Sequence, residues 1–155
     1  MLGDKPRFLI IREIIAPLEE KNMPCYVTRI ATIEIPVREI ETSVNWYSKT
    51  LNLVVQHKTD QDAMLSFNAK SVPTMYLVRT NAEARLSFDN TNTDITHSII
   101  DFYTYDLEGF YETLKEAGVE VGTINTNERG FGGFGFNDPD GNLLGATNIA
   151  HLGQE

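Results

Sequence analysis

Two separated stretches of the chain alternate apolar and polar residues, and a helical pattern follows each of them. In residues 27–37 every odd position from Ala31 to Val37 is apolar, which is the period of a strand with two unlike faces. The apolar spacing of residues 39–51 is that of an amphipathic helix, and Asn52 is a stop signal for it. Three short strands are then predicted, at 53–57, 63–68 and 74–80.

The same order of elements returns in the second half of the chain. Residues 97–105 alternate again, and Asp106 is a good N-cap for a helix over residues 107–117. Gly118 supplies the left-handed residue that commonly ends a helix. The remaining strands are predicted at 119–124, 131–136 and 143–148.

This repeat sets the predicted domain organisation. Residues 1–22 form an N-terminal extension, and within it residues 4–20 are either an amphipathic helix or a poorly ordered segment. Residues 23–155 form one α+β domain of two βαβββ modules. Module one covers 27–80, a polar linker rich in Asn, Asp and Thr covers 81–95, and module two covers 96–148. Within the linker, a small extended piece is expected near residues 85–88.

Composition narrows the classes of partner. The 155 residues include 22 acidic and 13 basic ones, for a formal charge of −9, and no Lys or Arg cluster is present to bind phosphate, so no nucleic-acid partner is expected. No apolar run approaches the roughly 18 residues of a membrane span, so no membrane partner is expected. Cys25 is the only cysteine, which excludes an intrachain disulfide and suits a cytoplasmic protein.

Several motifs carry a resemblance to a known family. These are residues 37–47 with the Leu51–Leu53 tripeptide, the pair Asp106-Leu107 with residues 114–119, and the turn sequence Asn-Asp-Pro-Asp-Gly-Asn at 137–142. Together they resemble the glyoxalase/bleomycin resistance/dioxygenase superfamily, also called vicinal oxygen chelate. That resemblance implies paired βαβββ modules whose mixed sheets curve around a cleft. The turn itself is explained by Pro and Gly turn chemistry alone.

The resemblance also implies four places for metal ligands, on the first and last strand of each module. Enzymes of the superfamily usually hold a divalent cation there with His, Gln or Glu side chains. In this chain the four places fall on Thr32, Leu77, Ile99 and Gly145. A shift of two residues would bring His97 or Glu34 to one place, but no single shift repairs all four. We therefore expect no metal and no other cofactor in the cleft.

Strand parity gives candidates for the cleft lining. Because the apolar odd positions of the first strand pack on its helix, Glu34 faces the cleft, and by the same reasoning Asp101 faces it from module two. Two such carboxylates would recognise a cationic or amine-bearing ligand or act as a general base; alternatively, Glu34 forms an ion pair with Arg79 and only lines the wall. The predicted ligand-binding residues are Thr32, Glu34, Met75, Leu77, Arg79, Ile99, Asp101, Tyr103 and Gly145.

Three functions remain open at this stage, and whether the protein is an enzyme is one of the open points. The first is a metal-free module that binds a small organic molecule, as the bleomycin-resistance branch of the family does. The second is a lyase, isomerase or dioxygenase with an atypical or metal-free site. The third is a structural or regulatory protein with a vestigial cleft. Loss of the ligand places favours the first, and the resemblance also implies a homodimer.

Overall fold

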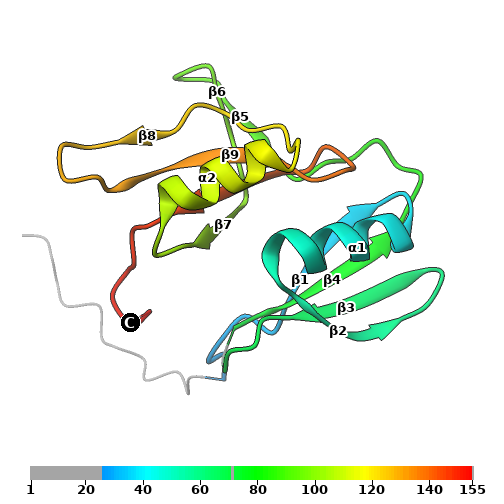
Figure 1. Cartoon of the computed structure of the whole chain (residues 1–155). Coiled ribbons are helices and arrows are strands. Elements are labelled where there is room, and N and C mark those ends of the chain that lie inside the picture. The colour runs from blue at the N-terminus through cyan, green and yellow to red at the C-terminus, as the bar shows by residue number, and fades with distance from the viewer. Residues whose placement is uncertain (1–25, 71, 155) are drawn as a thin grey trace, which may run out of the picture.

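Two four-stranded mixed sheets, each with one helix lying across it, make up the body of the molecule (Figure 1). The computed structural model describes residues 26–70 and 72–154, so the predicted extension at 1–22 lies outside the described residues. The α+β class with two repeated units is confirmed. No helix in the described part of the chain is long and apolar enough to cross a membrane.

Module one contains the first sheet, which we call sheet one. Its order is β1-β4-β3-β2, with β1 and β4 parallel and the other neighbours antiparallel. The helix buries Ile40, Val44 and Tyr47 on the face toward the sheet, and Asn52 ends it in the left-handed conformation at φ 55°. The elements are β1 (Thr32–Val37), α1 (Ile40–Leu51), β2 (Val54–Lys58), β3 (Asp62–Ser66) and β4 (Thr74–Arg79).

Module two repeats this topology in sheet two, whose order is β7-β10-β9-β8. As predicted, Asp106 caps its helix by accepting a hydrogen bond from the backbone N–H of Gly109 at 2.9 Å, and Gly118 follows the helix with φ 74°. The elements are β7 (Ile100–Tyr103), α2 (Leu107–Glu116), β8 (Asn125–Thr126), β9 (Gly132–Asn137) and β10 (Leu143–Thr147).

The strand predicted at 119–124 is wrong. Only Val121 forms an isolated bridge there, to Phe136, and the strand that follows is the two-residue β8. The partly buried residues Val119, Val121 and Ile124 pack against the core at a spacing of two and then three, which breaks the period of a strand. The segment therefore runs along β9 without continuous pairing.

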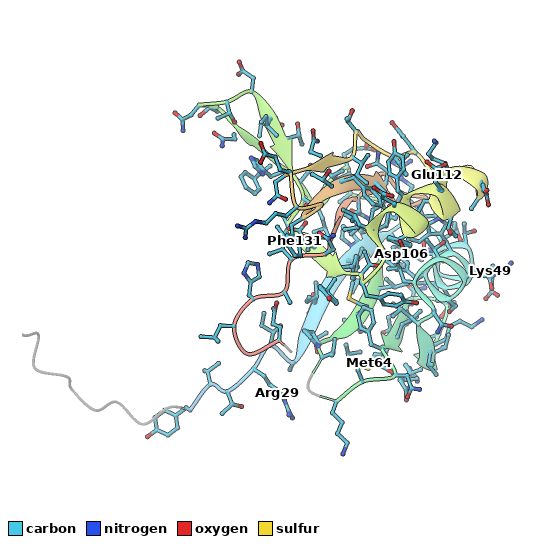
Figure 2. All side chains as sticks on the ribbon, turned by 60° about the vertical axis from the view of Figure 1, so that its left-hand side comes forward. Arg29, Lys49, Met64, Asp106, Glu112 and Phe131 are labelled. Carbon is cyan, nitrogen blue, oxygen red and sulfur yellow. The ribbon has the colours of Figure 1, made fainter. Side chains whose placement is uncertain are left out.

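The linker folds more fully than its polar composition suggested. It contains a two-stranded antiparallel hairpin of β5 (Phe88–Asn90) and β6 (Ile95–His97), which belongs to neither large sheet. Asp94 takes a left-handed conformation at φ 54° in the turn between the two strands. Figure 2 shows this hairpin projecting from the body of the molecule as a light-green arm.

The two modules share one hydrophobic core. Aromatic side chains meet between them, with Trp46 of α1 at 6.3 Å from Phe136 of β9 and Phe67 at 5.9 Å from Phe102 of β7, measured between ring centroids. Contacts between two aromatic rings stabilise the fold by more than the burial of their apolar area alone would give. The helix faces of both sheets therefore supply the buried layer that joins the modules.

The turn between β9 and β10 also joins the modules, through hydrogen bonds. The hydroxyl of Tyr47 donates to Asp138 at 2.8 Å, and the side-chain amide of Asn142 donates to the carbonyl of Pro36 at 2.9 Å. Asp140 accepts from the backbone N–H of Arg38 at 2.9 Å, just before α1, whose own N-cap residue makes no side-chain cap. The turn thus holds the segment that leads into the helix of the other module.

Candidate functional site

Each sheet has an open face, which is the face turned away from its helix. Thr32 and Glu34 of β1 are exposed on the open face of sheet one, because the alternate residues Ile35 and Val37 are buried under α1. On sheet two, Asp101 lies on the open face by the same alternation with Ile100. The two faces belong to different sheets. Asp101 lines a hollow on sheet two, described below, and Glu34 does not line it, so this hollow does not hold both carboxylates.

Met75 and Leu77 do not lie on the open face, so the expectation that they line the cleft is wrong. Met75 is 1% exposed and Leu77 is fully buried, because the parallel register pairs them with Ile33 and Ile35 on the helix side of the sheet. The residue of β4 that stands beside Glu34 is Tyr76.

The predicted ion pair between Glu34 and Arg79 does not form either. Arg79 lies at the end of β4, where its guanidinium is 3.3 Å from the carboxylate of Glu39. Its register partner on β1 is Val37, which is a residue of the helix side. Arg79 therefore belongs to the rim near the start of α1, away from the open face.

Sheet one carries a hydrogen-bonded cluster that the sequence analysis missed. The Tyr76 hydroxyl donates to Asp62 at 2.8 Å, and the Thr59 hydroxyl donates to the other oxygen of that carboxylate at 2.9 Å. The bond from Tyr76, followed by the bond from Thr59, lowers the pKa of Asp62, and the same carboxylate raises the pKa of Tyr76. The cluster depends on the β3–β4 register, and local periodicity cannot supply that register.

A hollow with a volume of about 270 Å³ lies on the open face of sheet two. Three residues of its floor have no side chain, because Gly133 and Gly135 of β9 and Gly145 of β10 all stand on this face, where Leu143 and Thr147 of β10 also line the hollow. Its polar wall comes from residues 96–98 and Asp101. Two predicted site residues, Ile99 and Tyr103, are exposed and are not among the residues that line it.

Asp101 is held above Gly145. The two residues are register partners on neighbouring strands, and a Cβ atom added at Gly145 would overlap the Asp101 carboxylate. The Ser98 hydroxyl donates to that carboxylate at 2.6 Å. The absence of a side chain at position 145 is therefore what allows the Asp101 carboxylate to lie over β10 and into the hollow.

The residues on these faces do not fit a divalent cation within one chain. Among the described residues there is no group of three or more His, Cys, Asp or Glu side chains that could hold a metal ion. With the observed register, the family ligand place on β4 falls on the open-face residue Tyr76 instead of Leu77, and it still carries no usual ligand. A metal-free site stays a prediction.

Comparison with known proteins places this architecture in a family. The model of the Glyoxalase/Bleomycin resistance protein/Dioxygenase superfamily matches residues 29–145, and the chain belongs to that superfamily. Comparison with curated protein sequences gives no match.

Solved structures show the same fold at low sequence identity. FosX, a fosfomycin resistance protein from Listeria monocytogenes, superposes with a TM-score of 0.64 and 12% identity over 83% of this chain and 98% of its own. TnmS3, an antibiotic binding protein from Streptomyces sp. CB03234, gives 0.60 and 18% over 79% and 96%. Lactoylglutathione lyase from Agrobacterium tumefaciens gives 0.58 and 14% over 79% and 94%. The fold is thus shared by proteins whose names describe both binding and catalysis, so it does not by itself assign an activity.

Proposed function

We propose that this protein binds a small organic molecule on the open face of sheet two without a metal ion, and that an organic cation is the preferred ligand. The observation that carries this proposal is the hollow in which the Asp101 carboxylate stands beside a glycine floor. An exposed carboxylate attracts a cationic group, and the formal charge of −9 on the whole protein attracts cations at longer range as well. The description of TnmS3 as an antibiotic binding protein agrees with small-molecule binding on this scaffold.

The proposal includes a homodimer in the cytoplasm. Both hollows described in the structure draw their residues from a single module, so a second copy could cover an open face and enclose a ligand. Val54 and Met64 are exposed apolar residues on the open face of sheet one, and contact of this face with a second copy would bury them. The single cysteine supports the cytoplasmic location. Size-exclusion chromatography with light scattering should give twice the mass of the chain, and a monomer at all concentrations would contradict the dimer.

Thermal-shift measurement with a panel of small amines and matched neutral compounds tests the ligand. A cationic compound should raise the melting temperature of the wild type, and Asp101→Asn should remove that increase because it removes the negative charge. Glu128→Gln is the control, since Glu128 is an exposed carboxylate in the loop before β9. Equal stabilisation of Asp101→Asn and wild type would contradict the proposed site.

Elemental analysis of protein purified without a chelator tests the absence of metal. One equivalent of nickel, zinc, iron or manganese that survives desalting would contradict the metal-free proposal. Incubation of the protein with any stabilising compound, followed by mass spectrometry of that compound, distinguishes binding from chemistry. An unchanged compound supports a binding protein, whereas turnover would favour the atypical enzyme.

A further inference from the structure

The β5–β6 hairpin forms part of the wall of the hollow on sheet two. Thr96 and His97 of β6 line the hollow together with Ser98, although the hairpin is part of neither four-stranded sheet. The arm that projects in Figure 2 is therefore joined at its base to the candidate site. A side chain on this arm can contact a ligand that rests on the glycines.

The His97 ring is supported by a stacked aromatic neighbour. The rings of Phe88 and His97 lie 5.2 Å apart between centroids with an interplanar angle of 14°, as register partners across the hairpin. Phe88 does not line the hollow, so it affects a ligand only through His97. On the same strand, the Thr96 hydroxyl donates to Asp89 of β5 at 2.7 Å, which further fixes the two strands.

We infer that the hairpin selects a ligand with two polar ends, in which a cationic or donor group meets Asp101 and an acceptor group such as a carboxylate meets His97. This inference rests on the proposed binding function and adds the second recognition element to it. In this arrangement His97 contacts the ligand, and Phe88 is a positioning residue that orients the imidazole.

The side chains of the wall support a ligand whose two ends differ in chemistry. Asp101 has only acceptor atoms in its ionised form, whereas an imidazole carries a ring N–H in either protonation state. The hollow therefore presents an acceptor and a donor on one surface. Between them the glycine floor exposes flat peptide groups, and the volume of about 270 Å³ suits a single ring. A small planar molecule with an amine at one end and a carboxylate at the other matches these features.

Four simple compounds distinguish the contribution of the cationic end of the ligand from that of its carboxylate end. Benzylamine carries only the cation, benzoate carries only the carboxylate, and meta- and para-(aminomethyl)benzoate carry both at two separations. Binding is followed by titration of each compound into isotope-labelled protein, with amide chemical shifts as the readout. At least one of the two-ended compounds should bind about tenfold more tightly than benzylamine, the factor that one hydrogen bond to a charged group contributes.

Variants of the hairpin then assign this gain to the hairpin. His97→Ala should lower the affinity for the two-ended compound about tenfold, and should lower the affinity for benzylamine by a clearly smaller factor. Phe88→Ala should remove part of the same gain, and Phe88→Tyr should restore it because the stacked ring returns. Ile95→Ala is the matched control, since Ile95 is an exposed apolar residue on the same strand that does not line the hollow.

The outcomes separate this inference from the proposed function. If benzylamine binds and Asp101→Asn removes its binding, but the carboxylate adds no affinity or His97→Ala leaves the added affinity intact, the role of the hairpin is overturned and the proposed function stands. If neither benzylamine nor a two-ended compound shifts the amides of sheet two, both are overturned. An equal loss in Ile95→Ala and Phe88→Ala would show that the hairpin acts only through its stability.

Discussion

Tyr47 provides the sharpest test of how the two modules are held together. Its side chain is fully buried in module one, and its hydroxyl donates a hydrogen bond of 2.8 Å to Asp138, which is 5% exposed and belongs to module two. Asp138 keeps further donors from Asp140 and Asn142 when this one is lost. We therefore expect Tyr47→Phe to remove one bond to a charged group without leaving the carboxylate bare, a loss of about 2 kcal/mol.

Chemical and thermal unfolding measure this loss directly. For a chain of this length about 2 kcal/mol corresponds to a decrease of about 4–8 °C in melting temperature. Tyr76→Phe is the matched control, since the hydroxyl of Tyr76 also donates to a carboxylate but lies on an open face. Its melting temperature should stay close to that of the wild type, because water replaces the lost donor.

Alkaline pH gives an independent check on the same bond. Burial, followed by the charge of Asp138, raises the pKa of Tyr47 above its ordinary value. A raised folded-state pKa means that the contribution to stability is complete below about pH 10, the pKa in the unfolded chain, and is lost as pH rises toward the folded-state value. The difference in unfolding free energy between wild type and Tyr47→Phe should therefore shrink by about 1.4 kcal/mol per pH unit above about pH 10.

Two results would refute this reasoning. A melting temperature of Tyr47→Phe within about 1 °C of wild type at neutral pH would show that the buried bond contributes almost nothing net. A difference between the two proteins that stays constant above pH 10 would show that folding does not raise the pKa of the Tyr47 hydroxyl.

Three further predictions concern the turn and the glycine floor. Asp140→Ala should cost about 1 kcal/mol in chemical unfolding, since it removes the acceptor for the backbone N–H of Arg38 and for the hydroxyl of Ser43, and an unchanged midpoint would contradict the role of this turn in joining the modules. Gly133→Ala should cost about 1–3 kcal/mol, because its Cβ would lie 2.5 Å from a backbone oxygen of β10, whereas Gly135→Ala should be tolerated, because its Cβ would lie 3.1 Å from a movable leucine side chain. Gly145→Ala should displace the Asp101 carboxylate and weaken binding of the stabilising amine in the thermal-shift assay, while the circular dichroism spectrum stays that of the wild type.

Local signals in the sequence were sufficient to predict the helices. The helix end at Asn52, the cap at Asp106 and the glycine after the second helix all lie where the sequence places them. Each depends on one residue and its immediate neighbours, because capping and left-handed geometry are satisfied within one helical turn. The predicted faces of the β1 and β7 residues are also correct, because alternation within a single strand determines which residues share a face.

The failures had two sources: ligand places carried over by resemblance against a local apolar pattern, and strand pairing that no single segment determines. Met75 and Leu77 alternate as apolar residues just as Ile33 and Ile35 do, and this pattern alone indicates the helix side of β4. The resemblance to the family instead placed a metal-ligand position of β4 at Leu77. The register of β1 and β4 moves that position to Tyr76, on the open face. No strand alternation marked the hairpin in the polar linker, since its stability comes from paired backbone and cross-strand contacts.

The relation between Asp101 and Gly145 is the structural basis of the proposed exchange of a metal site for an organic-cation site. At position 145, where the resemblance implies a metal-ligating side chain, the chain has no side chain, and the carboxylate of the neighbouring strand fills the vacated space. That carboxylate is bonded to Ser98, and the other ligand places offer Thr32, Ile99 and Tyr76. A divalent cation needs several charged or imidazole donors that converge on one point, whereas an organic cation needs one oriented carboxylate and a surface on which to rest. The open face of sheet two meets the second requirement, and a substitution that restores a side chain at position 145 removes the arrangement on which it depends.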